Sequence, residues 1–152
     1  MLTAKDIMTS KVVTIRESAT VRELAALLHT NNISGVPVVD DSDRVVGVAT
    51  ESDLIFQNKK VQPPITFALL DAFVFLERPG KMEQELKKMA GYKVSDICTR
   101  NPVSVSPDTE LDELATLMTE KKIHTLPVMA DGRLVGIIGK SDIIRTIAQG
   151  IE

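Results

Sequence analysis

The sequence predicts an α/β fold made of two copies of a β-α-β-β-α unit. An internal repeat carries this prediction, together with short β-branched runs and amphipathic helical stripes in each copy. Residues 6–9 (DIMT) return as residues 96–99 (DICT), and residues 33–38 (ISGVPV) match residues 123–128 (IHTLPV). Both pairs are ninety residues apart, which indicates two structural units of the same fold.

The first strand and the first long helix of each copy follow from local residue preferences. Residues 12–15 form a short β-branched run that suits a strand. Thr20 and Glu23 form a capping box, in which a hydroxyl and a carboxylate each satisfy a backbone N–H of the first helical turn. Apolar residues then recur at helical spacing, which predicts two helices that each bury one face. These residues are Val21, Leu24, Ala25 and Leu28 in the first copy, and Leu111, Leu114, Ala115 and Met118 in the second.

Two further strands and a final helix complete each copy. The strand-like runs of the first copy are residues 36–39 and 45–49. Residues 40–43 (DDSD) between them predict a turn, because Asp and Ser side chains bond their own backbone, and residues 131–132 (DG) predict the corresponding turn. The final helix is expected to begin near Thr50 in one copy and near Lys140 in the other.

The repeat also divides the chain. We expect a first unit over residues 1–57, a helical insert over 58–92 and a second unit over 93–152. Within the insert, residues 65–76 are apolar enough for a buried helix, and residues 80–92 predict a charged amphipathic helix. We therefore expect packed structure between the units.

Composition excludes several classes of function. The 152 residues are 43% hydrophobic and 26% charged, without an apolar run long enough to cross a bilayer or a signal-peptide pattern, so a cytoplasmic protein without membrane insertion is expected. A net charge of −3 with scattered lysines argues against nucleic-acid binding. One cysteine and two histidines give no recognisable zinc ligand set, and we expect no metal or tightly bound cofactor. No residue set has the partners that nucleophilic or acid–base catalysis requires, so no enzymatic activity is expected.

The stretch from Gly47 to Asp53 is the strongest candidate for ligand chemistry. We expect a strand to end at Gly47, where a ligand can approach the backbone, and a helix N-terminus that favours a phosphate to follow. Asp53 can accept hydrogen bonds from both hydroxyls of a ribose, and the Thr50 hydroxyl can reach the sugar or a phosphate. Alternatively Thr50 and Asp53 form only a local capping box, and the two roles can coexist.

The second copy keeps the carboxylate and loses the hydroxyl. Asp142 corresponds to Asp53, whereas Gly139 replaces Thr50, so the second half-site should bind more weakly. His124 stands just before the inner strand of this copy, either as a surface or satisfied core residue or as a ligand contact.

The doubled unit, the apolar-Pro-Val stretches at 36–38 and 126–128, and the endings at 47–53 and 136–142 resemble the cystathionine-β-synthase (CBS) domain family. The resemblance covers nearly the whole chain and implies a stand-alone pair of CBS repeats. It further implies an intramolecular pseudo-twofold pair with facing sheets, and a cleft that can hold AMP, ADP, ATP or S-adenosylmethionine. Gly139 departs from the family's Ser/Thr pattern.

The resemblance also implies which residues line the cleft. A phosphate contact at position 124 is common in the family, which favours the ligand role of His124. The residues expected at the first half-site are Thr50, Asp53, Thr99, Ser104, His124, Thr125, Leu126, Pro127 and Lys140. Those expected at the second are Thr9, Thr14, Ser34, Gly35, Val36, Pro37 and Asp142, with Glu51 nearby.

A regulatory sensor of an adenine nucleotide is therefore the expected function, acting on a separate effector protein. The alternative is an interaction or dimerisation module with vestigial ligand clefts. The apolar stripes over residues 21–28 and 111–118 also predict a homodimer, because large exposed apolar patches are rare on monomers.

Overall fold

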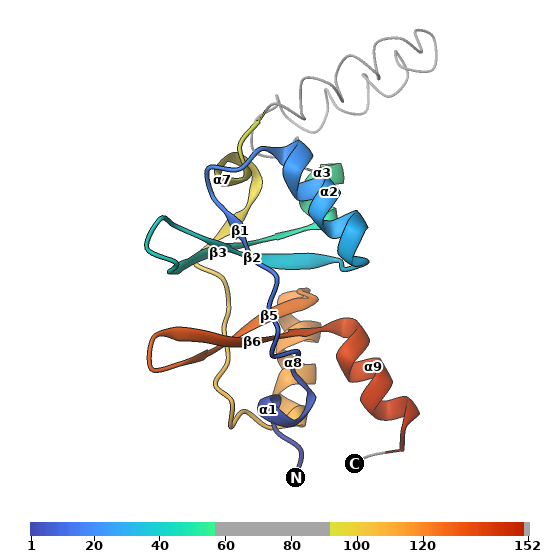
Figure 1. Cartoon of the computed structure of the whole chain (residues 1–152). Coiled ribbons are helices and arrows are strands. Elements are labelled where there is room, and N and C mark those ends of the chain that lie inside the picture. Colours follow the sequence, from blue (N-terminus) through green and yellow to red (C-terminus); the bar gives the residue numbers. More distant parts are fainter. Residues whose placement is uncertain (57–91, 151–152) are drawn as a thin grey trace, which may run out of the picture.

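The computed structural model describes residues 1–56 and 92–150, arranged as two stacked α/β halves (Figure 1). The two helices expected over residues 65–76 and 80–92 belong to the insert and lie outside this part of the chain, apart from Tyr92. The elements of the first half of the chain are α1 (Ala4–Ile7), β1 (Ile15–Arg16), α2 (Val21–Asn31), β2 (Gly35–Val39), β3 (Val45–Thr50) and α3 (Glu51–Phe56). Those of the second half are α7 (Val94–Ile97), β4 (Thr99–Arg100), α8 (Leu111–Lys121), β5 (Thr125–Ala130), β6 (Arg133–Gly139) and α9 (Lys140–Ala148).

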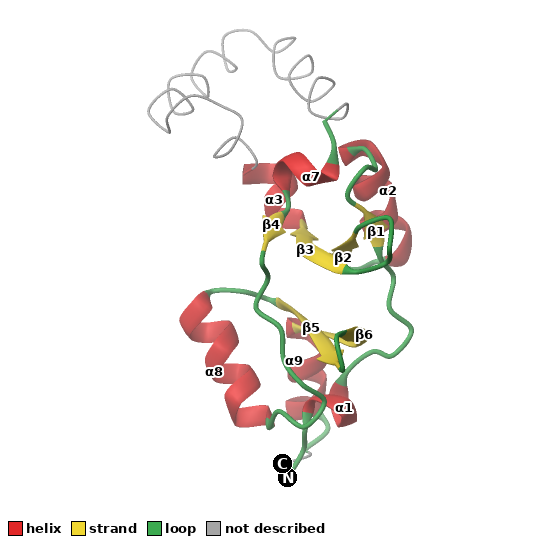
Figure 2. Cartoon of the chain, turned by 90° about the vertical axis from the view of Figure 1, so that its left-hand side faces the viewer, coloured by secondary structure: helices red, strands yellow, loops and turns green. Residues whose placement is uncertain are grey.

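The mixed α/β class and the doubled unit are confirmed. In each half the sheet lies toward the middle of the molecule and the helices lie outside it, so that the two sheets face each other (Figure 2). One sheet has four strands in the order β1-β2-β3-β4, and the other has the two strands β5 and β6.

The strand pairing repeats with the sequence. Ile15 of β1 pairs in parallel with Val38 of β2, and ninety residues later Val105 bridges in parallel to Val128 of β5. Likewise β4 pairs antiparallel with β3, and Thr9 makes the corresponding antiparallel bridge to β6. The two halves are therefore related by a pseudo-twofold axis at the level of strand register.

The first strand is shorter than the sequence predicts and shifted toward the C-terminus. Residues 12–14 are not in a strand, and only Ile15 and Arg16 pair with β2. The reason is the path of the chain, since Thr9 bridges to β6 of one sheet and Ile15 to β2 of the other. The residues between them cross from one half to the other and have no neighbouring strand.

Local sequence signals for caps and turns are confirmed. The Glu23 N–H donates to Thr20 Oγ1 at 3.1 Å, and the Thr20 N–H donates to Glu23 Oε2 at 3.4 Å, as a capping box requires. In the first turn, Asp40 Oδ1 accepts from the backbone N–H of residues 42 and 44 at 2.8 and 3.0 Å. In the second turn, Asp131 and Gly132 both have positive φ, 52° and 76°, as a tight hairpin requires.

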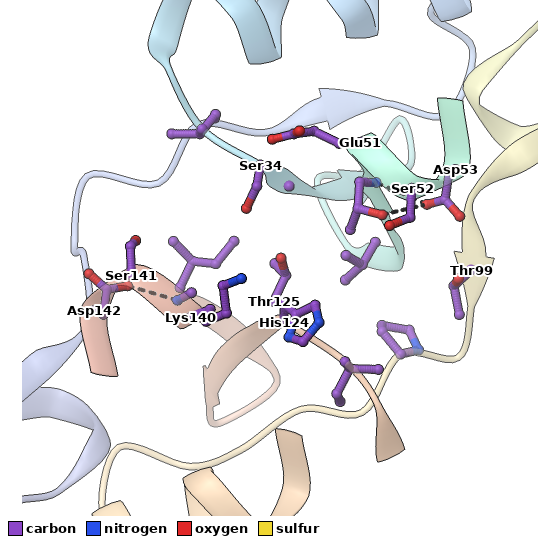
Figure 3. Close-up of a pocket in the computed structure, with 18 of the residues that line it drawn as sticks. Ser34, Glu51, Ser52, Asp53, Thr99, His124, Thr125, Lys140, Ser141 and Asp142 are labelled. Carbon is purple, nitrogen blue, oxygen red and sulfur yellow. Dashed lines mark hydrogen bonds between the residues drawn. The ribbon is translucent and has the colours of Figure 1, made fainter. Parts of the chain in front are cut away.

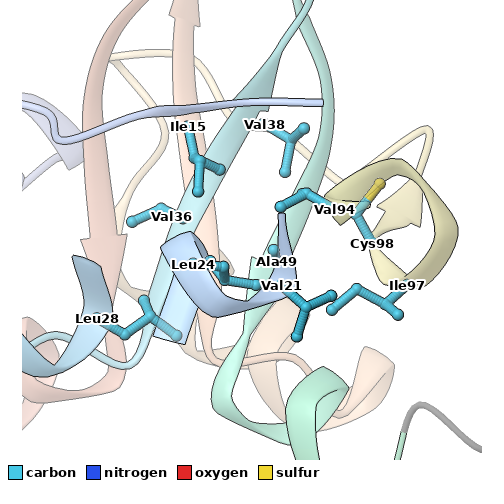
Figure 4. Close-up of a cluster of buried hydrophobic side chains, with 10 residues drawn as sticks. All are labelled: Ile15, Val21, Leu24, Leu28, Val36, Val38, Ala49, Val94, Ile97 and Cys98. Carbon is cyan, nitrogen blue, oxygen red and sulfur yellow. The ribbon is translucent and has the colours of Figure 1, made fainter. Parts of the chain in front are cut away.

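Each half has its own hydrophobic core beneath its sheet. The core of the upper half in Figure 1 is drawn in Figure 4. It contains Val21, Leu24 and Leu28 of α2, together with Val94 and Ile97 of α7. The other core is built around Leu114, Met118, Leu126 and Ile138, and it contains Ala4 and Ile7 of α1.

The large side chains of the apolar stripes of α2 and α8 are mostly covered by the chain itself, whereas Ala25 and Ala115 of the predicted stripes are exposed. Leu24 and Leu114 are 0% exposed, and Val21, Leu28 and Met118 are buried. The sequence-based argument for a homodimer is weakened, because most of the large side chains on these faces pack within their own halves. The homodimer remains a prediction.

Candidate functional site

A cleft of about 810 Å³ lies between the two halves, and both halves contribute to its walls. Figure 3 shows Asp53 and Thr99 toward one end of it and Asp142 and Ser141 toward the other. Ten of the residues expected at the two half-sites line this cleft. They are Thr9, Ser34, Gly35, Thr50, Asp53, Thr99, His124, Thr125, Lys140 and Asp142.

At the first end, Asp53 is tied to the end of strand β3. The Thr50 N–H donates to Asp53 Oδ2 at 2.9 Å, and the Thr50 hydroxyl lies 3.4 Å from the same oxygen. The backbone contact of the capping alternative is therefore present. The carboxylate is only partly buried and still lines the cleft, so it can also face a ligand. Thr99 is placed beside it because β4 pairs with β3, with Thr99 opposite Val48.

At the second end, both oxygens of the Asp142 carboxylate are occupied. Asp142 Oδ2 accepts from the Gly139 N–H at 2.7 Å, and Asp142 Oδ1 accepts from the Arg145 guanidinium at 2.9 Å. Asp142 is only 6% exposed. The residue that corresponds to Arg145 in the first copy is Phe56, which cannot supply such a charge. Asp142 is thus less able than its position in the sequence suggests to accept ribose hydroxyls.

The middle of the cleft is formed by the starts of β2 and β5 and of the helices that follow β3 and β6. The Glu51 N–H donates to the Ser34 carbonyl at 2.9 Å, and the Lys140 N–H donates to the His124 carbonyl at 3.1 Å. These two contacts are equivalent in the repeats. They place Ser34 and Glu51 on one side of the axis, and His124 and Lys140 on the other.

The two sides of the cleft differ in charge near its middle, whereas Lys11 of the first repeat, whose equivalent is Asn101, adds a basic residue elsewhere in the lining. At three equivalent positions, a neutral or acidic residue of the first repeat is replaced by a basic or titratable residue of the second. The pairs are Asn32 and Lys122, Ser34 and His124, and Glu51 and Lys140. Basic residues on the second repeat favour an anionic group of a ligand, which agrees with the phosphate contact that the resemblance implies at His124.

Sequence reasoning missed two of the lysines in the lining, Lys11 and Lys122. Lys122 ends α8 in the left-handed region with a φ of 55°, where Asn32 ends α2 with a φ of 52°. Asparagine tolerates this conformation better than lysine does. An alignment of the two repeats at this helix end would have identified Lys122 as a candidate.

Six of the expected site residues lie outside the lining of the cleft. Val36 and Leu126 are fully buried in the two cores, because successive strand residues alternate between faces and Gly35 and Thr125 take the cleft side. The remaining four are Pro37, Pro127, Ser104 and Thr14.

The reasons for these four exclusions differ, and Ser104 is an exposed residue of the segment between β4 and α8 that does not line the cleft. Pro37 and Pro127 are among the fully buried side chains. Thr14 lines a different hollow, between the hairpin turns, with Arg44 and Arg133. Apolar walls of the cleft come instead from residues that sequence reasoning did not name. They include Val13, Ile33, Pro102, Val103 and Ile123.

The expected role of Gly47 is also corrected. Gly47 lies inside β3, which continues to Thr50, and a Cβ added to it would lie 2.7 Å from the Thr99 carbonyl oxygen. The close approach that requires a glycine here is made by β4 of the same chain. A ligand is not needed to explain it.

Comparison with protein families agrees with this architecture. The family model of the CBS domain matches residues 4–58 and again residues 94–149, which together are more than half of the chain. The chain belongs to the CBS domain family.

Relatives of this CBS pair extend over nearly its whole length. The uncharacterized protein MJ1426 of Methanocaldococcus jannaschii is 30% identical over 151 residues, which are 94% of this chain and 89% of that protein. The chloroplastic CBS domain-containing protein CBSX2 of Arabidopsis thaliana is 29% identical over 140 residues, and the match spans 58% of its length.

Solved structures show the same CBS pair. A crystal structure of CBSX2 in complex with AMP is 29% identical, with a TM-score of 0.70 and coverage of 98% of both chains. A CBS domain of a membrane protein from Sphaerobacter thermophilus is 28% identical, with a TM-score of 0.70 over 95% of this chain and 87% of that one. Among the described residues of the present chain, no helix has the length and apolar character to span a membrane.

Proposed function

We propose that this CBS pair is a non-catalytic sensor that binds AMP, ADP, ATP or S-adenosylmethionine and regulates a separate effector protein. The observation that carries the proposal is the cleft, in which a partly buried carboxylate at Asp53 lies across from the basic residues His124 and Lys140. CBSX2, which is 29% identical, has been crystallised with AMP. We also propose that the protein works in the cytoplasm as a homodimer.

The residues of the first half-site suit the parts of an adenine nucleotide. Asp53 can accept the ribose hydroxyls, since carboxylate oxygens accept several hydrogen bonds. Pro102 and Val103 supply apolar surface for the base. His124 and Lys140 supply donors for phosphate, where charge-assisted bonds are stronger than neutral ones.

One observation favours the alternative, an interaction or dimerisation module with vestigial clefts. Asp53 Oδ2 already accepts a hydrogen bond from the Thr50 backbone, as a purely structural cap would. A carboxylate can accept more than one bond, so this contact lowers the need for a ligand without removing the capacity to bind one.

A thermal-shift panel separates the two candidates. The ligands are AMP, ADP, ATP, adenosine, S-adenosylmethionine and NAD, run beside a hydrolysis assay. At a hundredfold excess over its Kd, a ligand of the native state adds about 2.7 kcal/mol of stability, which gives a readily measured rise in Tm. No rise with any ligand would support the vestigial module, and hydrolysis of a nucleotide would contradict a non-catalytic sensor.

Calorimetry on two alanine variants tests the assignment of the half-sites. We expect Asp53→Ala to weaken the binding of AMP by about tenfold or more, because hydrogen bonds to a charged group are worth about 1.5–3 kcal/mol. Asp142→Ala should weaken it much less, since Gly139 and Arg145 already occupy that carboxylate. A larger loss in Asp142→Ala would show that the second half-site is the main one, and an equal loss would show that the two half-sites contribute alike.

A further inference from the structure

The Arg145 side chain of α9 joins the second end of the cleft to the N-terminal segment, residues 4–13. Its guanidinium donates to Asp142 Oδ1 at 2.9 Å and to the Ile7 carbonyl, at the end of α1, at 3.4 Å. The two helices lie together in the lower half of Figure 1. Asp142 lines the cleft, and Arg145 lies outside the lining. A residue outside the cleft therefore connects a candidate ligand-binding carboxylate to the segment that crosses between the halves.

The two partners of this ion pair differ in their freedom to move. The side chain of Asp142 is 8% exposed, and that of Arg145 is 53% exposed. The Thr146 hydroxyl donates to the Asp142 carbonyl at 2.8 Å, and the Gly139 N–H donates to Asp142 Oδ2 at 2.7 Å, so the carboxylate is fixed in the first turn of α9. Arg145 can turn into solvent, because half of its side chain already lies there. The guanidinium is thus the exchangeable partner.

Arg145 holds one of the two carboxylate oxygens that a ribose would use. Both hydroxyls of a ribose can donate to one carboxylate, but a guanidinium binds a carboxylate more strongly than a neutral hydroxyl does. In the first copy, the residue three positions after the aspartate is Phe56, which carries no charge. Only the second half-site has this competitor within its own helix.

The same N-terminal segment reaches the cleft at two further residues, Thr9 and Lys11. Thr9 exchanges two backbone hydrogen bonds with Ile137 of β6, at 2.9 and 3.0 Å, which places it on the sheet that leads to α9. Lys11 can attract an anionic group whether or not Arg145 is in place. Attraction of an anion by Lys11 and closure of the Asp142 carboxylate are therefore separate properties of this end.

We propose that Arg145 keeps the second half-site closed to a ribose, and that a nucleoside bound to Asp142 displaces Arg145 and thereby releases the end of α1. The inference rests on the proposed nucleotide function and deepens it. A ligand at the Asp53 end leaves the contact between Arg145 and the Ile7 carbonyl in place. A ligand at the Asp142 end removes it, so the N-terminal segment reports which end of the cleft is filled.

The binding test is calorimetry of adenosine in an Asp53→Ala background, which removes the first end. Adenosine carries a ribose without a phosphate, so its binding does not depend on the charge of Lys11. Arg145→Gln keeps a polar side chain and removes the charge, and it should raise the affinity of the second end by about tenfold or more, the size of a hydrogen bond to a charged group. Arg145→Lys keeps the charge and should stay close to the parent. Arg145→Phe, which copies the first repeat, is a second opening variant and should behave like Arg145→Gln.

Amide hydrogen exchange tests the release of α1. Ligand-free Arg145→Gln should exchange the amides of residues 4–8 about two- to tenfold faster than the wild type, because it loses one hydrogen bond to the end of α1. Adenosine at the second end of Asp53→Ala should speed the same amides, since it displaces the same guanidinium. Arg44→Gln is the matched control, because Arg44 pairs with Asp40 at 3.4 Å and lies outside the cleft. It should change neither the affinity nor the exchange.

The outcomes separate this inference from the function on which it rests. An unchanged affinity in Arg145→Gln, or an equal gain in Arg145→Lys, would show that the charge of Arg145 does not close the second end. Unchanged exchange of residues 4–8 would show that Arg145 does not hold α1. Each of these results overturns the inference and leaves the nucleotide sensor standing if the wild type binds at the Asp53 end. If neither the wild type nor Arg145→Gln binds adenosine or AMP, the proposed function and this inference are both wrong.

Discussion

At the scale of single residues, equivalent aspartates have different roles in the two repeats. Asp53 and Asp142 occupy equivalent positions, and each accepts a backbone N–H three residues earlier. Only Asp142 also binds Arg145, whose side chain is half exposed, while the side chain of Asp142 is 8% exposed. A buried carboxylate that pairs with a guanidinium is part of the fold, whereas a partly buried one at the edge of a cleft can face a ligand.

This difference predicts opposite consequences for stability and for binding. We expect Asp142→Ala to lower the free energy of unfolding by about 1.5–3 kcal/mol, because it removes the hydrogen bonds of a charged group that is itself buried. Asp53→Ala should cost only about 1 kcal/mol, the usual value of a helix cap. Urea unfolding of the two variants without ligand measures both effects. Equal losses would show that Asp53 is as structural as Asp142.

At the scale of elements, two glycines allow a crossing segment to lie against each sheet. Beside Gly47 of β3 runs β4, with the Thr99 carbonyl oxygen 2.7 Å from the position of an added Cβ and Cys98 Sγ at 3.1 Å. Beside Gly136 of β6 runs the N-terminal segment, and an added Cβ would overlap the Met8 side chain. The neighbour is rigid backbone in the first case and a flexible side chain in the second.

Alanine substitutions at the two glycines should therefore differ. We expect Gly47→Ala to cost about 1–3 kcal/mol, because β4 must move to admit the methyl group. Gly136→Ala should cost less than about 1 kcal/mol, since an unbranched methionine can change rotamer. Denaturant unfolding of the two variants decides between these values. A larger loss in Gly136→Ala would mean that Met8 is held in place as firmly as the β4 backbone.

At the scale of the whole molecule, the core of each half contains a short helix that precedes the opposite repeat in the sequence. Ile7 of α1 packs in the core beneath β5 and β6, and Ile97 of α7 packs in the core beneath β2 and β3. The Thr9 N–H also donates to the Ile137 carbonyl at 2.9 Å. The two repeats thus exchange their N-terminal segments, which contain α1 and α7. Neither core is made from one sequence repeat alone.

Hydrogen exchange on two matched variants tests this exchange of segments. Ile7→Ala and Ile97→Ala each remove a buried side chain, and each should cost about 2–5 kcal/mol. Ile7→Ala should speed amide exchange most in β5, β6 and α8, and Ile97→Ala most in α2, β2 and β3. If protection is instead lost mainly within the repeat to which the residue belongs by sequence, the exchanged arrangement is wrong.

The sequence by itself determined the features of this protein that depend on neighbouring residues. The α/β class, the doubled unit, the capping box at Thr20 and the turn at Asp40 all follow from spacing along one chain, and the structure has each of them. The resemblance to the CBS domain family rested on motifs that are contiguous in the sequence, and the match to the family model confirms it. Ten of the site residues that the resemblance and the motif at 47–53 led us to expect also line the cleft.

The tertiary structure alone decided which side chains meet. It showed that Val36 and Leu126 face the cores, that Arg145 occupies the Asp142 carboxylate and that Gly47 makes room for β4. It also showed that Val21, Leu24 and Leu28 of α2, and Leu114 and Met118 of α8, are already buried within their own halves. These facts depend on contacts between residues far apart in the chain, and on the exchange of the N-terminal segments between the two halves. Residue spacing carries no information about such contacts, because it records only what lies nearby along the chain.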